Sequence, residues 1–362
     1  MRPLLLLLAL GGCSMATVDA PDTEASSLPL LPDGLSVGVS FYGGGTFEGL
    51  TDGLQATLDD GIDSGLSAWT YYLEWSDLEA EAGRYTLDTF EQSLADAQAR
   101  GLRPFVNVTI GDSEGFSLPA GVSDPNDLDD PEVIERFGKL LDEIVPTLVA
   151  RGGMILGLGN EMGEYLDGDR ETRETYARFV DAARQRVHTI EPRLAVGVTL
   201  TTGAIRERSP TYRSMREVSD VVAFNYGPIP ASFVVLDLED IRRDFREVLD
   251  ASGDGPIVIQ ELTCPNAPSM GASDAWQADC FRELFAEIEQ TPQVRFASIF
   301  TFADFDEPTC SLIQDALLGD ELDDLPRDVA QRLADYFCAL GVVDVDGTPS
   351  PAWEVILDEI EG

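Results

Sequence analysis

Short apolar runs rich in β-branched residues recur along the chain, and longer stretches with apolar residues at helical spacing separate them. Several of the longer stretches end just before glycine or proline, which stop helices. The pattern therefore predicts strands that alternate with helices. The expected strands are residues 35–41, 67–72, 103–110, 154–159, 194–200, 220–226, 256–260 and 294–302. The expected helices lie near residues 50–64, 88–100, 131–150, 170–190, 237–251, 273–290 and 326–340.

This alternation indicates the fold class. Strands that alternate with helices pair in parallel, because each helix returns the chain to the start of the next strand. Eight such units close into an α/β barrel, the (β/α)8 or TIM barrel, with functional sites at the carboxyl ends of its strands. We expect one such domain over residues 35–362. The alternative, an open doubly wound sheet, requires a Gly-x-Gly-x-x-Gly turn after its first strand, and Gly43-Gly44-Gly45 lacks that spacing.

Two of the predicted strands end at a glutamate. The fourth strand leads into Asn160-Glu161, and the seventh leads into Gln260-Glu261. These strands lie on opposite sides of a barrel mouth, so their carboxylates can face each other across it. Hydrolysis of a glycosidic bond with retention needs such a pair, one member protonated and the other ionised. The alternative is that each glutamate only caps a strand or begins a helix.

Two neighbouring side chains extend this hypothesis. We expect Asn160 to hydrogen-bond the sugar hydroxyl next to the reacting carbon. We expect Tyr226, at the end of the sixth strand, to hold Glu261 ionised and oriented.

The N-terminus has the pattern of an export signal. Met-Arg-Pro precedes an apolar run that is too short to span a bilayer, and small residues follow. Leu10-Gly11-Gly12-Cys13 resembles a bacterial lipobox, in which the cysteine becomes the lipidated first residue. We therefore expect a lipoprotein signal peptide at 1–12, lipidation of Cys13, and a flexible tether at 13–34. The protein would be anchored to the cell membrane or outer membrane by this lipid alone, facing the periplasm or the exterior. An ordinary cleaved signal is the alternative.

The charge balance excludes some partners. The chain has 66 acidic and 24 basic residues and a net charge of −42. Nucleic acid is not an expected partner, because contact with phosphates requires Lys and Arg. Such a surface indicates either a salt-adapted source or a generally acidic secreted protein. His188, the single histidine, lies in a helical pattern, which argues against a Ser-His-Asp triad or a histidine metal site, and we expect no metal and no cofactor.

Four cysteines follow Cys13, and an even number in an exported protein indicates disulfides. Three pairings are possible. We favour Cys264–Cys280 and Cys310–Cys338, because each closes a loop within one late structural unit. Metal binding is less favoured, since no Cys-x-x-Cys spacing occurs.

These motifs together resemble the clan of retaining glycoside hydrolases built on the eightfold barrel, the cellulase- and β-galactosidase-like enzymes. Gly159-Asn160-Glu161 and Ile259-Gln260-Glu261 match its two catalytic segments, and Asn225-Tyr226 matches a tyrosine often found after strand six. Residues 72–85 and 341–353 resemble its segment after strand two and its closing segment, so the likeness covers about residues 35–357. The resemblance implies that Glu161 is the acid/base and Glu261 the nucleophile.

The sequence departs from this clan at the sugar platform. The clan usually has a tryptophan at the end of strand eight, where this chain offers Phe302. Trp75 and Trp276 are further candidates for stacking on sugar rings, and packing is the alternative for each.

The sequence therefore predicts a monomeric retaining glycoside hydrolase that acts on an extracytoplasmic oligo- or polysaccharide. One alternative is a catalytically inactive carbohydrate-binding surface lipoprotein on the same scaffold, and Phe302 at the platform position supports it. Another is a different kind of enzyme on the same barrel.

Overall fold

The computed structural model describes residues 30–41, 46–112, 115–318 and 326–361. The expected signal peptide, Cys13 and most of the expected tether lie outside these residues, as do Gly43–Gly45. Within the described ranges, no helix is both long enough and apolar enough to cross a membrane.

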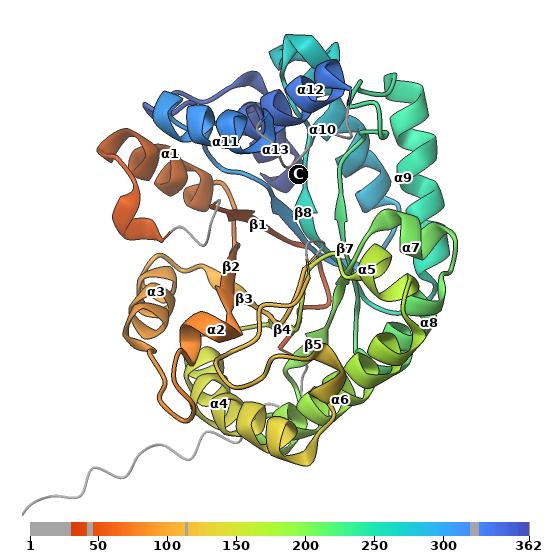
Figure 1. Ribbon diagram of the computed structural model, residues 1–362. Helices are drawn as coiled ribbons and strands as arrows, with labels where there is room; N and C mark the ends of the chain where they lie inside the picture. The colour runs from red at the N-terminus through yellow and green to blue at the C-terminus, as the bar shows by residue number, and fades with distance from the viewer. Residues whose placement is uncertain (1–29, 42–45, 113–114, 319–325, 362) are drawn as a thin grey trace, which may run out of the picture.

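One sheet forms the centre of the molecule (Figure 1). In the described part of the chain it contains nine parallel strands in the order β5-β4-β3-β2-β1-β9-β8-β7-β6. Only Val198 separates β5 from β6, and these two pair with β4 and β7 respectively. They are therefore two halves of one strand, and the sheet closes as the predicted eight-stranded barrel. The strands are β1 (Ser36–Ser40), β2 (Ala68–Glu74), β3 (Arg103–Thr109), β4 (Ile155–Gly157), β5 (Ala195–Gly197), β6 (Thr199–Leu200), β7 (Val222–Tyr226), β8 (Ile257–Leu262) and β9 (Val294–Ile299).

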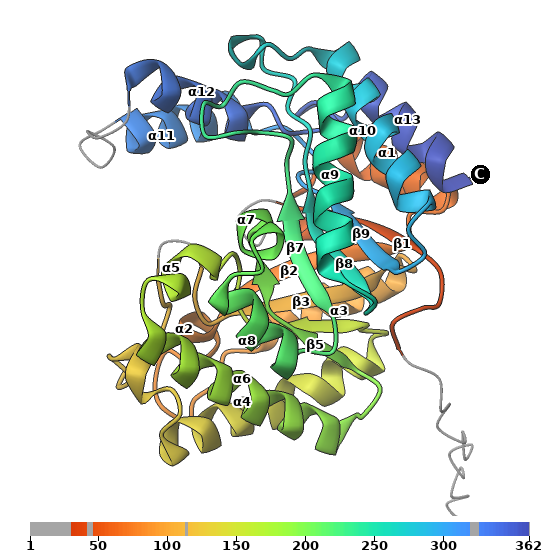
Figure 2. The same cartoon turned by 90° about the vertical axis from the view of Figure 1, so that its right-hand side faces the viewer.

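The long helices surround this barrel (Figures 1 and 2), and all seven predicted helices are present. Polar caps fix several of their starts: the side chains of Thr51, Asp130 and Ser273 accept hydrogen bonds from backbone N–H groups of the first turn. The helices are α1 (Asp52–Asp63), α2 (Trp75–Leu78), α3 (Asp88–Ala99), α4 (Pro131–Ala150), α5 (Gly163–Asp167), α6 (Arg170–Ile190), α7 (Thr202–Arg206), α8 (Pro210–Val218), α9 (Leu238–Ser252), α10 (Asp274–Glu289), α11 (Glu307–Leu318), α12 (Arg327–Cys338) and α13 (Pro351–Glu361).

The barrel interior is apolar at its base and polar nearer the carboxyl ends of the strands. Phe105 of β3 and Phe296 of β9 meet edge to face in the basal layer, 5.5 Å apart. Leu31 closes this layer from below and is 8% exposed, and the N–H of Leu30 donates to the carbonyl of Arg193. The domain therefore includes residues 30–34, which the sequence analysis assigned to the tether.

Both predicted disulfides are present. Cys264 follows β8 and pairs with Cys280 of α10, and both are fully buried. Cys310 and Cys338 join α11 to α12, and both are partly exposed.

Candidate active site

A cleft of about 730 Å³ opens at the carboxyl ends of the strands, where a barrel places its functional residues. Both glutamates singled out by the sequence lie in its wall. The residues that line it are Tyr71, Tyr72, Leu73, Glu74, Asp77, Thr109, Asp112, Asn160, Glu161, Phe233, Glu261, Phe300, Leu333, Tyr336 and Phe337.

Glu261 reaches the cleft because β8 is irregular. Successive residues of a strand normally point to opposite faces, and Gln260 already faces the interior. The pairing of β7 with β8 runs from Phe224–Ile259 to Asn225–Glu261, so Gln260 has no partner in the register. An extra residue of this kind re-aims the side chain that follows it. The side chains of Gln260 and Glu261 can therefore both point toward the same site, although they are consecutive in the strand.

The surroundings of Glu261 bear on its charge. Burial, followed by the negative charge of Glu161, raises the pKa of Glu261 to about 8, whereas hydrogen bonds from Tyr72, Gln260 and Asn225 lower it. The Tyr72 hydroxyl donates to Oε1 of Glu261 at 2.9 Å. Burial and the charge of Glu261 raise the pKa of Tyr72 well above its ordinary value, so this hydroxyl remains a donor.

Glu161 lies on the turn that follows β4, with φ 53°. This left-handed conformation is uncommon for a residue other than glycine and is typical of functional turns. Because its charge is the second largest cause of the raised pKa of Glu261, the two carboxyl groups act as one coupled pair. Near neutral pH such a pair retains one proton.

A network of buried amides holds the segments that carry the two glutamates. Nε2 of Gln260 donates to Oδ1 of Asn160 at 2.7 Å, and Nδ2 of Asn225 donates to the same oxygen at 3.1 Å. Nδ2 of Asn107 donates to Oε1 of Gln260 at 2.5 Å and to the carbonyl of Gly159 at 3.1 Å. The network therefore ties β3, β7 and β8 to the turn after β4.

Asn107 fits inside the barrel because a glycine faces it. A Cβ atom at Gly157 would lie 2.9 Å from Cγ of Asn107, closer than two such atoms approach. Thr199 adds another donor to the Oε1 of Gln260, at 2.6 Å. Sequence reasoning missed Asn107, Thr199 and Tyr72, although their alternation along the strands marks them as inward-facing.

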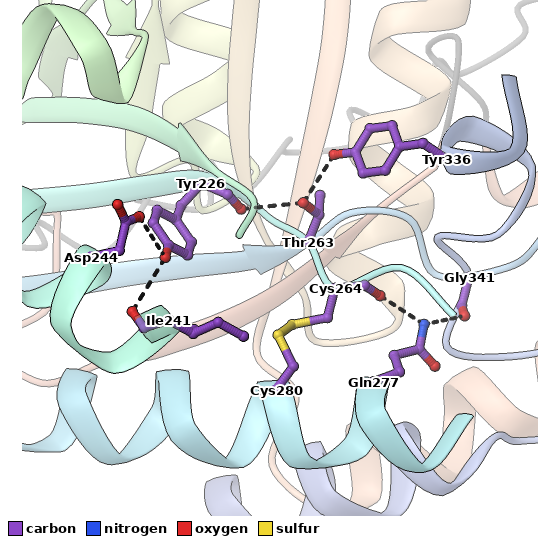
Figure 3. The surroundings of a disulfide bond; sticks show 9 residues. All are labelled: Tyr226, Ile241, Asp244, Thr263, Cys264, Gln277, Cys280, Tyr336 and Gly341. Carbon is purple, nitrogen blue, oxygen red and sulfur yellow. Dashed lines mark hydrogen bonds between the residues drawn. A yellow bond between two sulfur atoms is a disulfide. The ribbon is translucent and has the colours of Figure 1, made fainter. Parts of the chain in front are cut away.

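The expectation for Tyr226 is wrong. Its hydroxyl donates to Oδ2 of Asp244 on α9 at 3.0 Å and not to Glu261 (Figure 3). Its ring packs against Phe245. Tyr226 therefore faces the helix layer, although its residue borders a second cavity at the site. Tyr72, on the other side of the barrel, makes the hydrogen bond to Glu261 that was expected of Tyr226.

The three aromatic candidates for sugar stacking do not line the cleft. Trp75 is buried against Phe137 of α4, and its indole N–H donates to Glu79. Phe302 is fully buried and packs edge-on against Trp353 of the closing helix α13. Trp276 is half-buried on α10, in the outer layer. The rings that do line the cleft are Tyr71, Tyr72, Phe233, Phe300, Tyr336 and Phe337.

No protein-family model and no curated protein sequence matches this chain. Solved structures of glycoside hydrolases do match its fold. The exo-β-1,4-mannosidase Op5Man5 from Opitutaceae bacterium strain TAV5 has a TM-score of 0.63 at 17% identity, over 90% of this chain and 59% of the mannosidase. A GH5_18 protein from Bifidobacterium longum subsp. longum ATCC 55813, in complex with Manβ1-4GlcNAc, has a TM-score of 0.67 at 14% identity, over 90% of this chain and 78% of the other.

A family 39 glycoside hydrolase from Bacteroides cellulosilyticus WH2 has a TM-score of 0.60 at 12% identity, over 92% of this chain and 64% of that one. The neighbours thus belong to two glycoside hydrolase families of the clan that the sequence motifs resemble. At these identities the likeness defines the class of fold, the barrel on which these glycoside hydrolases are built. This chain spans only 59% of the length of the mannosidase.

Proposed function

We propose that this protein is a retaining glycoside hydrolase in which Glu161 is the acid/base and Glu261 the nucleophile. The observation that carries the proposal is the coupled pair: two glutamates from opposite strands of the barrel share one cleft, and the charge of one raises the pKa of the other. A pair that retains one proton provides both the acid and the nucleophile of a double displacement.

The reaction would proceed in two steps. Glu161 donates its proton to the glycosidic oxygen while a carboxylate oxygen of Glu261 attacks the anomeric carbon, so the bond to the leaving sugar breaks and a glycosyl ester forms. Glu161, now ionised, removes a proton from water, and the water oxygen displaces Glu261 from the anomeric carbon. The two inversions restore the original configuration, and both carboxyl groups return to their starting states.

The hydrogen bonds around the pair support this division of roles. Donors from Tyr72, Gln260 and Asn225 each lower the pKa of Glu261, so they favour its ionised form. Asn160 accepts hydrogen bonds through Oδ1 from Gln260 and Asn225, which leaves its NH2 group to donate to a sugar hydroxyl in the cleft.

For the substrate we propose a β-mannoside as the first candidate, because two of the structural neighbours are an exo-β-1,4-mannosidase and a protein in complex with Manβ1-4GlcNAc. The cleft wall contains Glu74, Asp77 and Asp112 besides the glutamate pair, and no described Lys or Arg lines it. An anionic sugar would be repelled there, so we propose a neutral glycan.

We also propose that the protein acts outside the cytoplasm, tethered through lipidated Cys13. The signal-like N-terminus and the two disulfides support this proposal, since disulfides persist in oxidising compartments. Cys13→Ser should move the protein from the membrane fraction to the soluble fraction. Retention of the variant in the membrane fraction would contradict the anchor.

The decisive experiment is hydrolysis of a panel of aryl glycosides and β-1,4-linked oligosaccharides, beginning with β-mannosides. Glu161→Gln and Glu261→Gln should each lower kcat by about 10³-fold or more, whereas Glu239→Gln, an exposed change on α9, should leave it unaltered. NMR of the first-formed product should show the anomer of the substrate. The opposite anomer would rule out retention, and sugar binding without turnover by the wild type would favour the inactive binding protein.

A further inference from the structure

The segment between β9 and α13 carries a helix pair that the barrel itself does not require. Figure 2 shows α11 and α12 projecting beyond the carboxyl ends of the strands, where the cleft lies. Three residues of α12, Leu333, Tyr336 and Phe337, line the cleft. The helix pair is therefore one of its walls.

Tyr336 lies at the centre of the site. A second cavity of about 220 Å³ adjoins the cleft, and four residues border both spaces: Glu161, Glu261, Phe233 and Tyr336. Phe233 and Tyr336 are in ring contact, with centroids 6.1 Å apart. Burial and the charges of both glutamates raise the pKa of Tyr336. A sugar seated at the glutamate pair would therefore also lie against these two rings.

Hydrogen bonds fix this tyrosine in place (Figure 3). The Tyr336 hydroxyl lies 3.0 Å from Oγ1 of Thr263, which follows β8. Thr263 donates to the carbonyl of Tyr226 at 3.3 Å, so Tyr336 is the donor in the first contact. On the same helix, Arg332 donates to the carbonyl of Ser232 at 2.8 Å, which ties α12 to the loop that carries Phe233.

Two disulfides flank this contact. Cys264 is the residue after Thr263, and its bond to Cys280 is fully buried. Cys338 lies two residues after Tyr336, and its bond to Cys310 is partly exposed. The Cys264–Cys280 bond therefore fixes the barrel side of the contact, and the Cys310–Cys338 bond fixes the helix pair. Only the Cys310–Cys338 bond is exposed to a reductant in solvent.

We propose, on the basis of the glycosidase function proposed above, that Tyr336 is a specificity-determining residue that seats the substrate sugar against the glutamate pair, and that the Cys310–Cys338 disulfide holds it in position. Substrate binding then depends on the redox state of this one bond. The buried pair Cys264–Cys280 is an internal reference that mild reduction leaves intact.

The first test uses Tyr336→Ala and Tyr336→Phe with β-1,4-mannobiose, β-1,4-mannotetraose and the aryl substrate from the panel. Loss of the ring should raise KM about ten-fold while kcat changes less than about three-fold, because the contact is made equally in the ground state and the transition state. Tyr336→Phe retains the ring and should recover most of the affinity. Tyr165→Ala removes a 40% exposed ring outside the cleft and should behave as the wild type.

The second test opens the partly exposed disulfide. A trialkylphosphine gives the Cys310–Cys338 bond two electrons, two protons come from water, and the phosphine becomes its oxide. Mass spectrometry after alkylation should show two modified cysteines, and KM should rise about three- to ten-fold with the protein still folded. The double variant Cys310→Ser, Cys338→Ser should show the raised KM without reductant and no further response to it. An unchanged KM with Cys310 and Cys338 alkylated would overturn the role of the disulfide.

Calorimetric titration of the Glu261→Gln variant with β-1,4-mannotetraose separates this inference from the proposed reaction. If the double variant Glu261→Gln, Tyr336→Ala binds the tetraose more weakly than Glu261→Gln alone, the inference is supported. Turnover that persists in Glu261→Gln would refute only the proposed mechanism. If Tyr336→Ala alters neither binding nor KM, the inference about Tyr336 is refuted. The proposed mechanism is then still supported, provided that turnover depends on Glu261. Failure of every glycan to bind or react with the wild type would refute both.

Discussion

The pKa of Glu261 is set by effects of opposite sign. Burial and the neighbouring Glu161 favour its neutral form, and three hydrogen-bond donors favour its charged form. The balance places its pKa at about 8, so the pair keeps a single proton over the neutral range and loses it above that value. Two properties of the protein should follow from this balance.

The first is the pH dependence of activity. Because the mechanism needs one proton on the pair, kcat/KM should fall as pH rises through about 8. Tyr72→Phe removes a hydrogen bond that lowers the pKa of Glu261. The fall in kcat/KM at alkaline pH should therefore move to higher pH, and kcat should fall about ten-fold or more. Steady-state kinetics from pH 5 to 10 provide the measurement. A fall in kcat/KM that moves to lower pH in this variant would contradict the assigned hydrogen bond.

The second is the pH dependence of stability. The folded protein raises the pKa of Glu261 from 4.5 to about 8, so it binds a proton that the unfolded chain has released between these values. This group favours folding below pH 4.5 and loses that contribution as pH rises through 8. Glu261→Gln removes the buried charge and should raise the Tm at pH 9 by about 2–6 °C, with little difference at pH 4. Thermal denaturation of both proteins across this range would show it, and equal Tm values at pH 9 would contradict it.

At the scale of elements, alternation along the chain was enough to predict the barrel and seven of its helices, whereas α11 and α13 were not predicted. Glu161, Glu261 and Asn160 could also be found, because a polar residue at the end of a buried strand stands out in the sequence. The bulge at Gln260 could not be predicted, since register depends on the neighbouring strands. The roles of Trp75, Phe302 and Tyr226 were misassigned because a ring near a strand end has the same sequence pattern whether it faces the cleft or the helix layer.

The amide network gives a prediction at this scale. Asn107→Ala would leave Oε1 of Gln260 with one donor fewer and the carbonyl of Gly159 without its Nδ2 contact. We expect the free energy of unfolding to fall by about 1–3 kcal/mol and kcat to fall as well, because the turn that carries Glu161 is less firmly held. Denaturant unfolding and kinetics would measure both effects. Asn266→Ala, at an exposed contact with Asp274, is the control that should change neither.

For the whole molecule, the net charge of −42 is the dominant property. Many arginines already form ion pairs, among them Arg246 with the almost fully buried Glu287. The acidic residues still outnumber the basic ones by 66 to 24, so repulsion remains between exposed carboxylates. Salt screens this repulsion, with a screening length of about 3 Å at 1 M.

Added salt should therefore stabilise the protein. We expect the Tm to rise as NaCl increases from 10 mM to about 1 M, because relief of the net repulsion outweighs the weakening of exposed ion pairs, which contribute about 0–1 kcal/mol each. Choline chloride at the same ionic strength controls for a specific effect of sodium. A Tm that stays constant or falls with salt would exclude a salt-adapted protein.

The pairing of β1 with β9 has a consequence for how the chain reaches its native state. This seam joins residues such as Ser40 and Ile299, which hydrogen-bond across 259 positions of sequence. Contacts of such long range make folding slow, since the intervening chain must be ordered before they form. The ring cannot be completed while the last strand is still missing, so a chain in synthesis remains open. The export proposed above would benefit from that delay, because a polypeptide without a closed barrel can still be threaded across a membrane.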